Sequence, residues 1–204
     1  MIKGVKICGI SDITTLTHIL DHDFPPKFIG FICDYKKSKR YVSYERLKTL
    51  LNVDRKNTNF VSVLVNPENE VLERMKKLNF DFLQLYNVEP KKTKMIKEKY
   101  GIKIITALTI IDQNDVNEYK NYMGISDIFL FDGKGYEKSI GFDHKLLNSV
   151  PNSLNKMIAG NIKLDDIHNF NDKDIYVDLS GALENEDGKK DVNKIDRLLN
   201  LVNK

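Results

Sequence analysis

The residues that could do chemistry in this sequence stand at or near the ends of short apolar runs. The run Val5–Ile10 carries a single thiol, Cys8, which is followed directly by a glycine. A cysteine thiolate can remove a proton, so we expect Cys8 to be one half of an acid–base pair; a depressed pKa would favour that role. A buried structural thiol is the competing interpretation, because cysteine is among the residue types most often found in protein cores.

Two carboxylates occupy comparable positions. Asp132 follows the apolar run Ile128–Phe131, and Asp178 lies inside the run Tyr176–Leu179. A carboxylate within an apolar run needs a partner or a function, so Asp178 is a candidate site residue. Asp132 is a second candidate, although Asp followed by Gly is also common turn chemistry.

Gln84 and Arg40 are the other polar candidates. Gln84 is expected at the end of the strand that begins at Phe82, and Arg40 lies in a polar loop after the run Phe28–Ile32. Only five of the 32 basic residues are arginine, so an arginine in a polar loop is a candidate ligand-binding residue. Two alternatives remain open: Arg40 could be an ordinary surface charge, and Gln84 could satisfy backbone groups at the barrel rim. The four histidines lack metal-ligand spacing, and we predict no metal site.

Two glycine-containing turns indicate an anion site. Gly160 and Asn161 follow one apolar run, and Ser180 and Gly181 follow the next. In many barrels the loops after strands seven and eight hold a phosphate, because small residues let backbone N–H groups approach the anion. These four residues are therefore predicted to bind phosphate, with two ordinary glycine turns as the alternative.

Eight apolar runs position these residues, and amphipathic stretches fall in most of the gaps between them. Most runs are continuously apolar, which is typical of strands in a parallel sheet covered by helices. They start roughly 20 to 32 residues apart, about the length of one strand-plus-helix unit. The runs are Val5–Ile10, Phe28–Ile32, Phe60–Val65, Phe82–Leu85, Lys103–Leu108, Ile128–Phe131, Lys156–Ala159 and Tyr176–Leu179.

Eight such units fit either a closed barrel or a long open sheet. The barrel is favoured because no glycine-rich dinucleotide fingerprint follows the first run, and because 204 residues is near the short end of barrel lengths. No linker rich in Pro, Gly or Ser divides the chain. The sequence therefore predicts an α/β fold in which a single (β/α)8 TIM-barrel domain spans residues 1–204.

Local signals add detail to this fold. Ser43 is expected to cap a helix that starts at Tyr44, and Asn66 to cap another with Pro67 at its first position. Asp132–Gly141, with three glycines, is the best candidate for a mobile loop, and Glu184–Lys190 is expected to form a second polar loop.

Composition narrows the class of partner. The chain is 41% hydrophobic and 30% charged with a net charge of +3, which is ordinary for a globular protein. No basic block indicates nucleic acid, and no apolar run approaches the roughly 20 residues of a membrane span. The start of the chain has no signal-peptide pattern, and Cys8 and Cys33 are a weak case for a disulfide. We expect a reduced, cytoplasmic protein that binds neither nucleic acid nor membrane.

The segment Lys6-Ile7-Cys8-Gly9-Ile10 resembles the opening motif of the phosphoribosylanthranilate isomerase family, and the resemblance continues along most of the chain. The first and last matching segments are the most specific. The other segments that resemble the family are Phe28–Phe31, Ser38–Ser43, Val63–Asn66, Phe82–Leu85, Leu130–Asp132, and Val177–Glu184 with Gly188–Asp191.

This resemblance implies a (β/α)8 barrel that performs an Amadori-type rearrangement in tryptophan biosynthesis without metal or cofactor. Asp132 would be the general acid that protonates the furanose ring oxygen, and Cys8 the general base that removes the C2 proton. Arg40 would face the anthranilate carboxylate, while Gln84 and Asp178 would help to bind the substrate. The expected partner is a small phosphorylated molecule, and the expected state is a monomer or homodimer.

Several loops depart from the family pattern. Tyr86-Asn87 stand where the family has His-Gly, and Tyr136–Ser139 stand near its Gly-Gly-Thr-Gly run. The turns Gly160–Ile162 and Ser180–Ala182 also differ from it. One alternative is therefore a diverged barrel that binds a phosphorylated ligand without turnover. Another is a related isomerase of aminoimidazole ribotide, although that family has Asp where this chain has Cys8.

Overall fold

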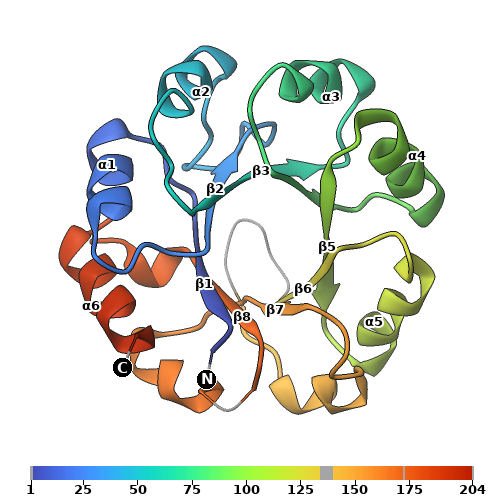
Figure 1. Cartoon of the computed structure of the whole chain (residues 1–204). Helices are drawn as coiled ribbons and strands as arrows, with labels where there is room; N and C mark the ends of the chain where they lie inside the picture. The colour runs from blue at the N-terminus through green and yellow to red at the C-terminus, as the bar shows by residue number, and fades with distance from the viewer. Residues whose placement is uncertain (1, 134–139, 172, 204) are drawn as a thin grey trace.

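Eight parallel strands form a closed barrel in the order β1 to β8, with β8 paired to β1 (Figure 1). The structure is a computed structural model that describes residues 2–133, 140–171 and 173–203. Helices surround the barrel, and the predicted (β/α)8 fold class is confirmed. The strands are β1 (Gly4–Cys8), β2 (Phe28–Ile32), β3 (Asn59–Val65), β4 (Phe82–Tyr86), β5 (Lys103–Ile110), β6 (Ile128–Gly133), β7 (Lys156–Ile158) and β8 (Tyr176–Leu179).

Every strand overlaps its predicted run, and the differences lie at the strand ends. Strand β1 stops at Cys8 because Gly9 turns the chain with a φ of +80°. Strand β4 continues to Tyr86, so Gln84 lies in the middle of this strand rather than at its end. This correction matters because Gln84 and Tyr86, two residues apart, point to the same face.

The helical segments include one that the sequence patterns did not indicate. Helix α1 follows β1, and its N-cap Asp12 accepts a hydrogen bond from the Thr15 amide. Among the described residues, no helix is long and apolar enough to cross a membrane. The α-helices are α1 (Ile13–Asp21), α2 (Tyr44–Leu50), α3 (Asn69–Lys76), α4 (Pro90–Tyr100), α5 (Gln113–Asn117) and α6 (Val192–Val202). The 3₁₀ helices are η1 (Glu118–Tyr122), η2 (His144–Ser149), η3 (Leu164–Phe170) and η4 (Gly181–Leu183).

One of the two predicted helix caps is correct. Ser43 accepts from the Arg46 amide and caps α2. The prediction for Asn66 is wrong, because α3 begins at Asn69 with Glu68 as its N-cap. Asn66 instead adopts a φ of +42° at the end of β3, a left-handed turn that asparagine tolerates.

The two predicted polar loops are described to different extents. Within Asp132–Gly141, residues 134–139 lie outside the described part of the chain, so the prediction of a mobile loop there stays a prediction. In the second loop, Glu184 and Lys190 pair through an antiparallel bridge that closes the turn between them.

Two apolar layers hold the barrel together. One lies between the strands and the helices, and the other lies in the barrel interior, enclosed by the strands. At the start of the strands the interior is filled by aromatic rings. Phe28 meets Phe82 and Tyr176 edge-to-face, with ring centroids 5.5 and 5.1 Å apart. This plug closes the N-terminal end of the barrel and leaves the C-terminal end for a ligand.

The ends of β6 and β7 meet at glycines. Gly160, two residues after β7, has a φ of +95°, and a Cβ there would lie 2.6 Å from the amide nitrogen of Gly133. We predict that Gly160→Ala lowers the free energy of unfolding by about 3 kcal/mol, through backbone strain and the clash together. Urea unfolding monitored by circular dichroism measures this loss.

Gly124→Ala is the matched control for this substitution. Gly124 also has a positive φ, +74°, but a Cβ there would meet nothing within 4 Å. Its loss is expected to be about 1 kcal/mol, from backbone strain alone. Equal losses in the two variants would show that the close approach of β6 and β7 is not what requires Gly160.

Candidate active site

A cavity of about 340 Å³ lies at the C-terminal ends of the strands, where (β/α)8 barrels carry their active sites. All nine residues that the sequence predicts for the site line this cavity. They come from six of the strands and the segments after them, so the fold brings together residues up to 173 positions apart in the chain. The nine residues are Cys8, Arg40, Gln84, Asp132, Gly160, Asn161, Asp178, Ser180 and Gly181.

A buried ion pair inside the barrel joins the neighbouring strands β1 and β8. Lys6 and Asp178 are register partners, and the Lys6 Nζ donates to Asp178 Oδ2 at 2.7 Å. Burial alone would lower the pKa of Lys6, but the negative charges of Asp178 and Cys8 and the hydrogen bonding to them together outweigh it and raise this pKa to about 12. Lys6 is therefore the partner that the buried carboxylate requires. A lysine inside an apolar run, two residues before Cys8, was a signal available in the sequence.

Cys8 shares the inward face of β1 with Lys6 and is 8% exposed. Gly30 on the neighbouring strand makes room for both: a Cβ there would lie 2.9 Å from Cys8 Sγ and 3.0 Å from Lys6 Nζ. Burial raises the pKa of the Cys8 thiol, while the charges of Lys6 and Lys190 oppose that rise. The direction is opposite to the depressed pKa that would favour a base, so Cys8 needs a further positive charge to ionise.

Asp132 reaches the cavity from β6 and is linked to two residues of β4. The Tyr86 hydroxyl donates to Asp132 Oδ2 at 2.7 Å, and Gln84 Nε2 donates to the Tyr86 oxygen at 3.3 Å. Burial raises the pKa of Asp132 to about 6, although the hydrogen bond from Tyr86 opposes the rise. A carboxyl group with this pKa retains its proton much closer to neutral pH than an exposed aspartate, as a general acid requires.

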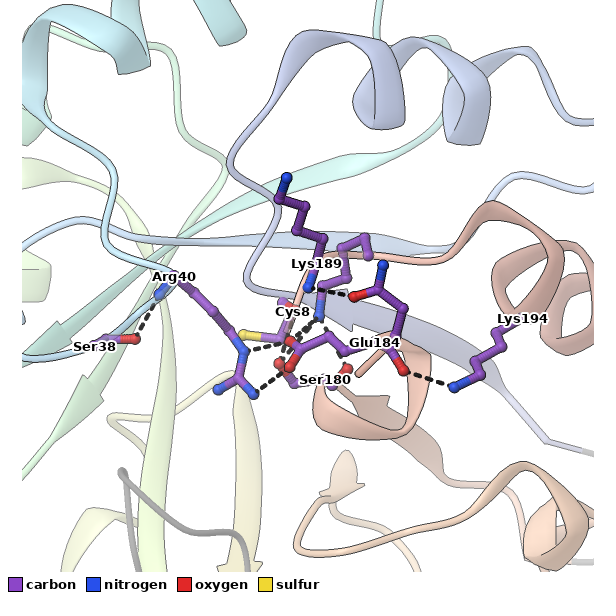
Figure 2. A network of polar contacts seen from close by, with 9 residues as sticks. Cys8, Ser38, Arg40, Ser180, Glu184, Lys189 and Lys194 are labelled. Atoms are coloured by element: carbon purple, nitrogen blue, oxygen red, sulfur yellow. Dashed lines mark hydrogen bonds and ion pairs between the residues drawn. The ribbon is translucent and has the colours of Figure 1, made fainter. Parts of the chain in front are cut away.

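Arg40 lines the cavity and is held by the carboxylate of Glu184 (Figure 2). Its Nε and Nη2 donate to the two oxygens of Glu184 at 2.5 and 2.9 Å, a bidentate pair. Its side chain runs over Gly9, where a Cβ would lie 2.4 Å from Arg40 Cδ. Burial would raise the pKa of Glu184, but Arg40 and Lys190 outweigh it and lower this pKa.

The end of β8 is tied to the end of β1 through Ser180 (Figure 2). The Ser180 hydroxyl donates to the Cys8 carbonyl oxygen at 3.0 Å. Lys190 Nζ donates to the Ser180 carbonyl at 2.9 Å and to Glu184 at 3.0 Å. Sequence reasoning assigned no role to Lys6, Tyr86, Glu184 or Lys190, although all four contact predicted site residues.

Within the described ranges, no group of three or more His, Cys, Asp or Glu side chains is placed to hold a metal ion. The chain itself supplies groups for proton transfer and hydrogen bonding at the cavity. A carboxyl group that retains its proton and a thiol beside a lysine face one cavity from β6 and β1. The fold and this site together define a (β/α)8-barrel enzyme of the acid–base class.

Comparison with known proteins identifies the family. The family model described as N-(5'phosphoribosyl)anthranilate (PRA) isomerase matches residues 5–201. The chain therefore belongs to the N-(5'-phosphoribosyl)anthranilate isomerase family, as the sequence motifs indicated.

Individual relatives agree with this assignment. Proteins named N-(5'-phosphoribosyl)anthranilate isomerase from Agrobacterium fabrum and Rhizobium johnstonii are 30% and 31% identical, and each alignment covers 100% of this chain and 96% of the relative. The crystal structure of phosphoribosyl anthranilate isomerase from Thermotoga maritima is 25% identical, with a TM-score of 0.86 over 100% of this chain and 99% of that one.

The raised pKa of Asp132 has a consequence for stability. The folded protein holds this proton more tightly than the unfolded chain, so the fold loses stability as the pH rises from 3.8, the ordinary pKa of an aspartate, to the folded pKa of about 6, and the loss is complete above that pH. We predict that Asp132→Asn increases the free energy of unfolding by about 3 kcal/mol at pH 8, falling to about half of that at pH 5. Urea unfolding of both proteins at the two pH values measures the difference. A gain that does not change with pH would contradict the raised pKa.

Proposed function

We propose that this protein converts N-(5-phosphoribosyl)anthranilate to 1-(2-carboxyphenylamino)-1-deoxyribulose 5-phosphate, the isomerisation step of tryptophan biosynthesis. The observation that carries the proposal is the placement of Asp132 and Cys8, an acid and a base, on one cavity. The family to which the chain belongs supports the same reaction. The ligand class is a small phosphorylated molecule.

In the proposed reaction Asp132 gives its proton to the furanose ring oxygen. The C1–O bond breaks while the anthranilate nitrogen supplies an electron pair, which produces an iminium ion with an open chain. The raised pKa of Asp132, about 6 through burial, keeps the proton available for this step.

Cys8 then removes the proton from C2. To do so the thiol first loses its own proton to solvent, and the thiolate is favoured by the charge of Lys6 and by the charge of the iminium ion. Loss of the C2 proton gives an enolamine; gain of a proton at C1 and loss of the C2 hydroxyl proton give the ketone. The substrate is oxidised at C2 and reduced at C1, so no redox cofactor takes part.

Substrate binding is assigned to the other residues that line the cavity. The buried oxygens Gln84 Oε1 and Asp178 Oδ1 accept no hydrogen bond within the described structure, and we assign them to the sugar hydroxyls. The small turns at Gly160, Asn161, Ser180 and Gly181 are assigned to the phosphate. Arg40 is assigned to the anthranilate carboxylate.

The first test is an isomerase assay that follows the loss of fluorescence of freshly made phosphoribosylanthranilate. We expect turnover by the parent and a loss of about 10²-fold or more in Cys8→Ala and in Asp132→Asn, since each removes one proton-transfer group. Cys33→Ala is the matched control: Cys33 is also a buried free thiol, but it donates to the Phe31 carbonyl. Its activity should equal that of the parent.

Two results would contradict the proposal. Binding of the substrate to the parent without turnover would indicate a diverged binding protein. Equal losses in Cys8→Ala and Cys33→Ala would indicate that the thiols act through packing rather than through proton transfer.

The role of Arg40 is tested with a substrate that lacks the carboxylate. We expect the parent to prefer phosphoribosylanthranilate to the corresponding aniline compound by about tenfold or more in kcat/KM, the value of one charge-assisted hydrogen bond. Arg40→Met should lose this preference, whereas Arg46→Met should keep it, because Arg46 donates to the Ser11 carbonyl outside the cavity. A preference that survives in Arg40→Met would rule out this contact.

A further inference from the structure

Tyr86 is the residue in contact with Asp132 that neither the motifs nor the proposed reaction assigns. It is the last residue of β4, is 7% exposed and lines the cavity. Its hydroxyl lies 2.7 Å from Asp132 Oδ2. Tyr86 is also one of the residues by which this chain departs from the family pattern.

The neighbouring Gln84 sets the direction of this hydrogen bond. Gln84 Nε2 donates to the Tyr86 oxygen at 3.3 Å, and the phenol proton is then directed at Asp132. The result is a relay in which Gln84 donates to Tyr86 and Tyr86 donates to Asp132. Both donors are on the inward face of β4. The acceptor is on β6, which is separated from β4 by β5 in the barrel.

The relay distinguishes the two oxygens of Asp132. Oδ2 is occupied as an acceptor, so the acid form carries its transferable proton on Oδ1. When that proton leaves, the carboxylate keeps the hydrogen bond from Tyr86, now charge-assisted and stronger. The phenol therefore stabilises the ionised product of the proton transfer more than the acid form.

We propose that Tyr86 is a positioning residue that fixes the orientation of the Asp132 carboxyl and strengthens it as an acid. The proposal rests on the proposed function only in treating Asp132 as the general acid. The phenol stays protonated in this role, because burial and the negative charge of Asp132 raise the pKa of Tyr86 well above its usual value.

The other charges around Asp132 act on it regardless of residue 86. Asp178 on β8 raises the pKa of Asp132, while Lys6 on β1 and the backbone amide of Gly133 lower it. Asp178 and Cys8 also face Tyr86. Removal of the Tyr86 hydroxyl leaves these groups in place, so the resulting change in the pKa of Asp132 measures the effect of the phenol alone.

The test measures the titration of Asp132 directly in the full-length protein. The carboxyl carbon of Asp132 is followed by NMR between pH 4 and 9 in the parent, in Tyr86→Phe and in Tyr119→Phe, with Asp132→Asn to assign the signal. Tyr119 is the matched control, because it is also a buried tyrosine but packs outside the barrel against Phe129.

We expect the Asp132 midpoint to rise by about one pH unit in Tyr86→Phe, the value of one hydrogen bond to a charged group, and to stay unchanged in Tyr119→Phe. The limb of the kcat/KM pH profile whose midpoint matches the NMR titration should move by the same amount. A loss of packing alone would lower activity without moving either midpoint.

Gln84→Met provides a second variant should Tyr86→Phe fail to fold. It removes the donor to the phenol oxygen and should raise the Asp132 midpoint by a smaller amount in the same direction. An unchanged or lowered midpoint in a folded Tyr86→Phe protein, or in Gln84→Met where that variant replaces it, overturns the proposal. If the Asp132 midpoint rises in Tyr86→Phe but the parent has no isomerase activity, the result supports the relay and rejects the proposed function.

Discussion

The ion pair between Lys6 and Asp178 is the constraint on which the site depends. An unpaired charge in the barrel interior would cost about 3–5 kcal/mol, so the two strands that carry the pair must meet in this register. That register closes the barrel at β1 and β8. It also fixes Cys8, two residues after Lys6, and Ser180, two residues after Asp178, whose hydroxyl reaches the Cys8 carbonyl. One electrostatic requirement therefore sets both the barrel closure and the position of the thiol.

Glycines provide the space that this arrangement needs. Gly30 leaves room for the Lys6 ammonium and the Cys8 sulfur, and Gly9 leaves room for the Arg40 side chain. Gly160 lets the end of β7 approach β6 at Gly133. In each case a Cβ would clash with a side chain or a backbone segment at the cavity. The shape of the cavity is thus determined by missing side chains as much as by those that line it.

The sequence predicted the fold, and its nine candidate site residues all line one cavity, but it did not predict the contacts between them. Continuous apolar runs identify buried parallel strands, and the strand-end rule of barrels brings distant residues to one cavity. Partners such as Lys6 for Asp178, 172 positions apart, depend on strand register, which apolar runs do not specify. The cap at Asn66 failed for a local reason, because its left-handed turn ends β3 before α3 begins.

Burial acts on the two proposed proton-transfer groups in the same direction but with opposite consequences. It raises the pKa of Asp132 to about 6, so that more of this acid is protonated near neutral pH, and it raises the pKa of Cys8, so that less of this thiol is ionised. In the proposed reaction the positive iminium ion exists only after the ring has opened. Because that charge favours the thiolate, Cys8 becomes a base only after Asp132 has given its proton. A buried site with one lysine beside the thiol would thereby enforce the order of the two proton transfers.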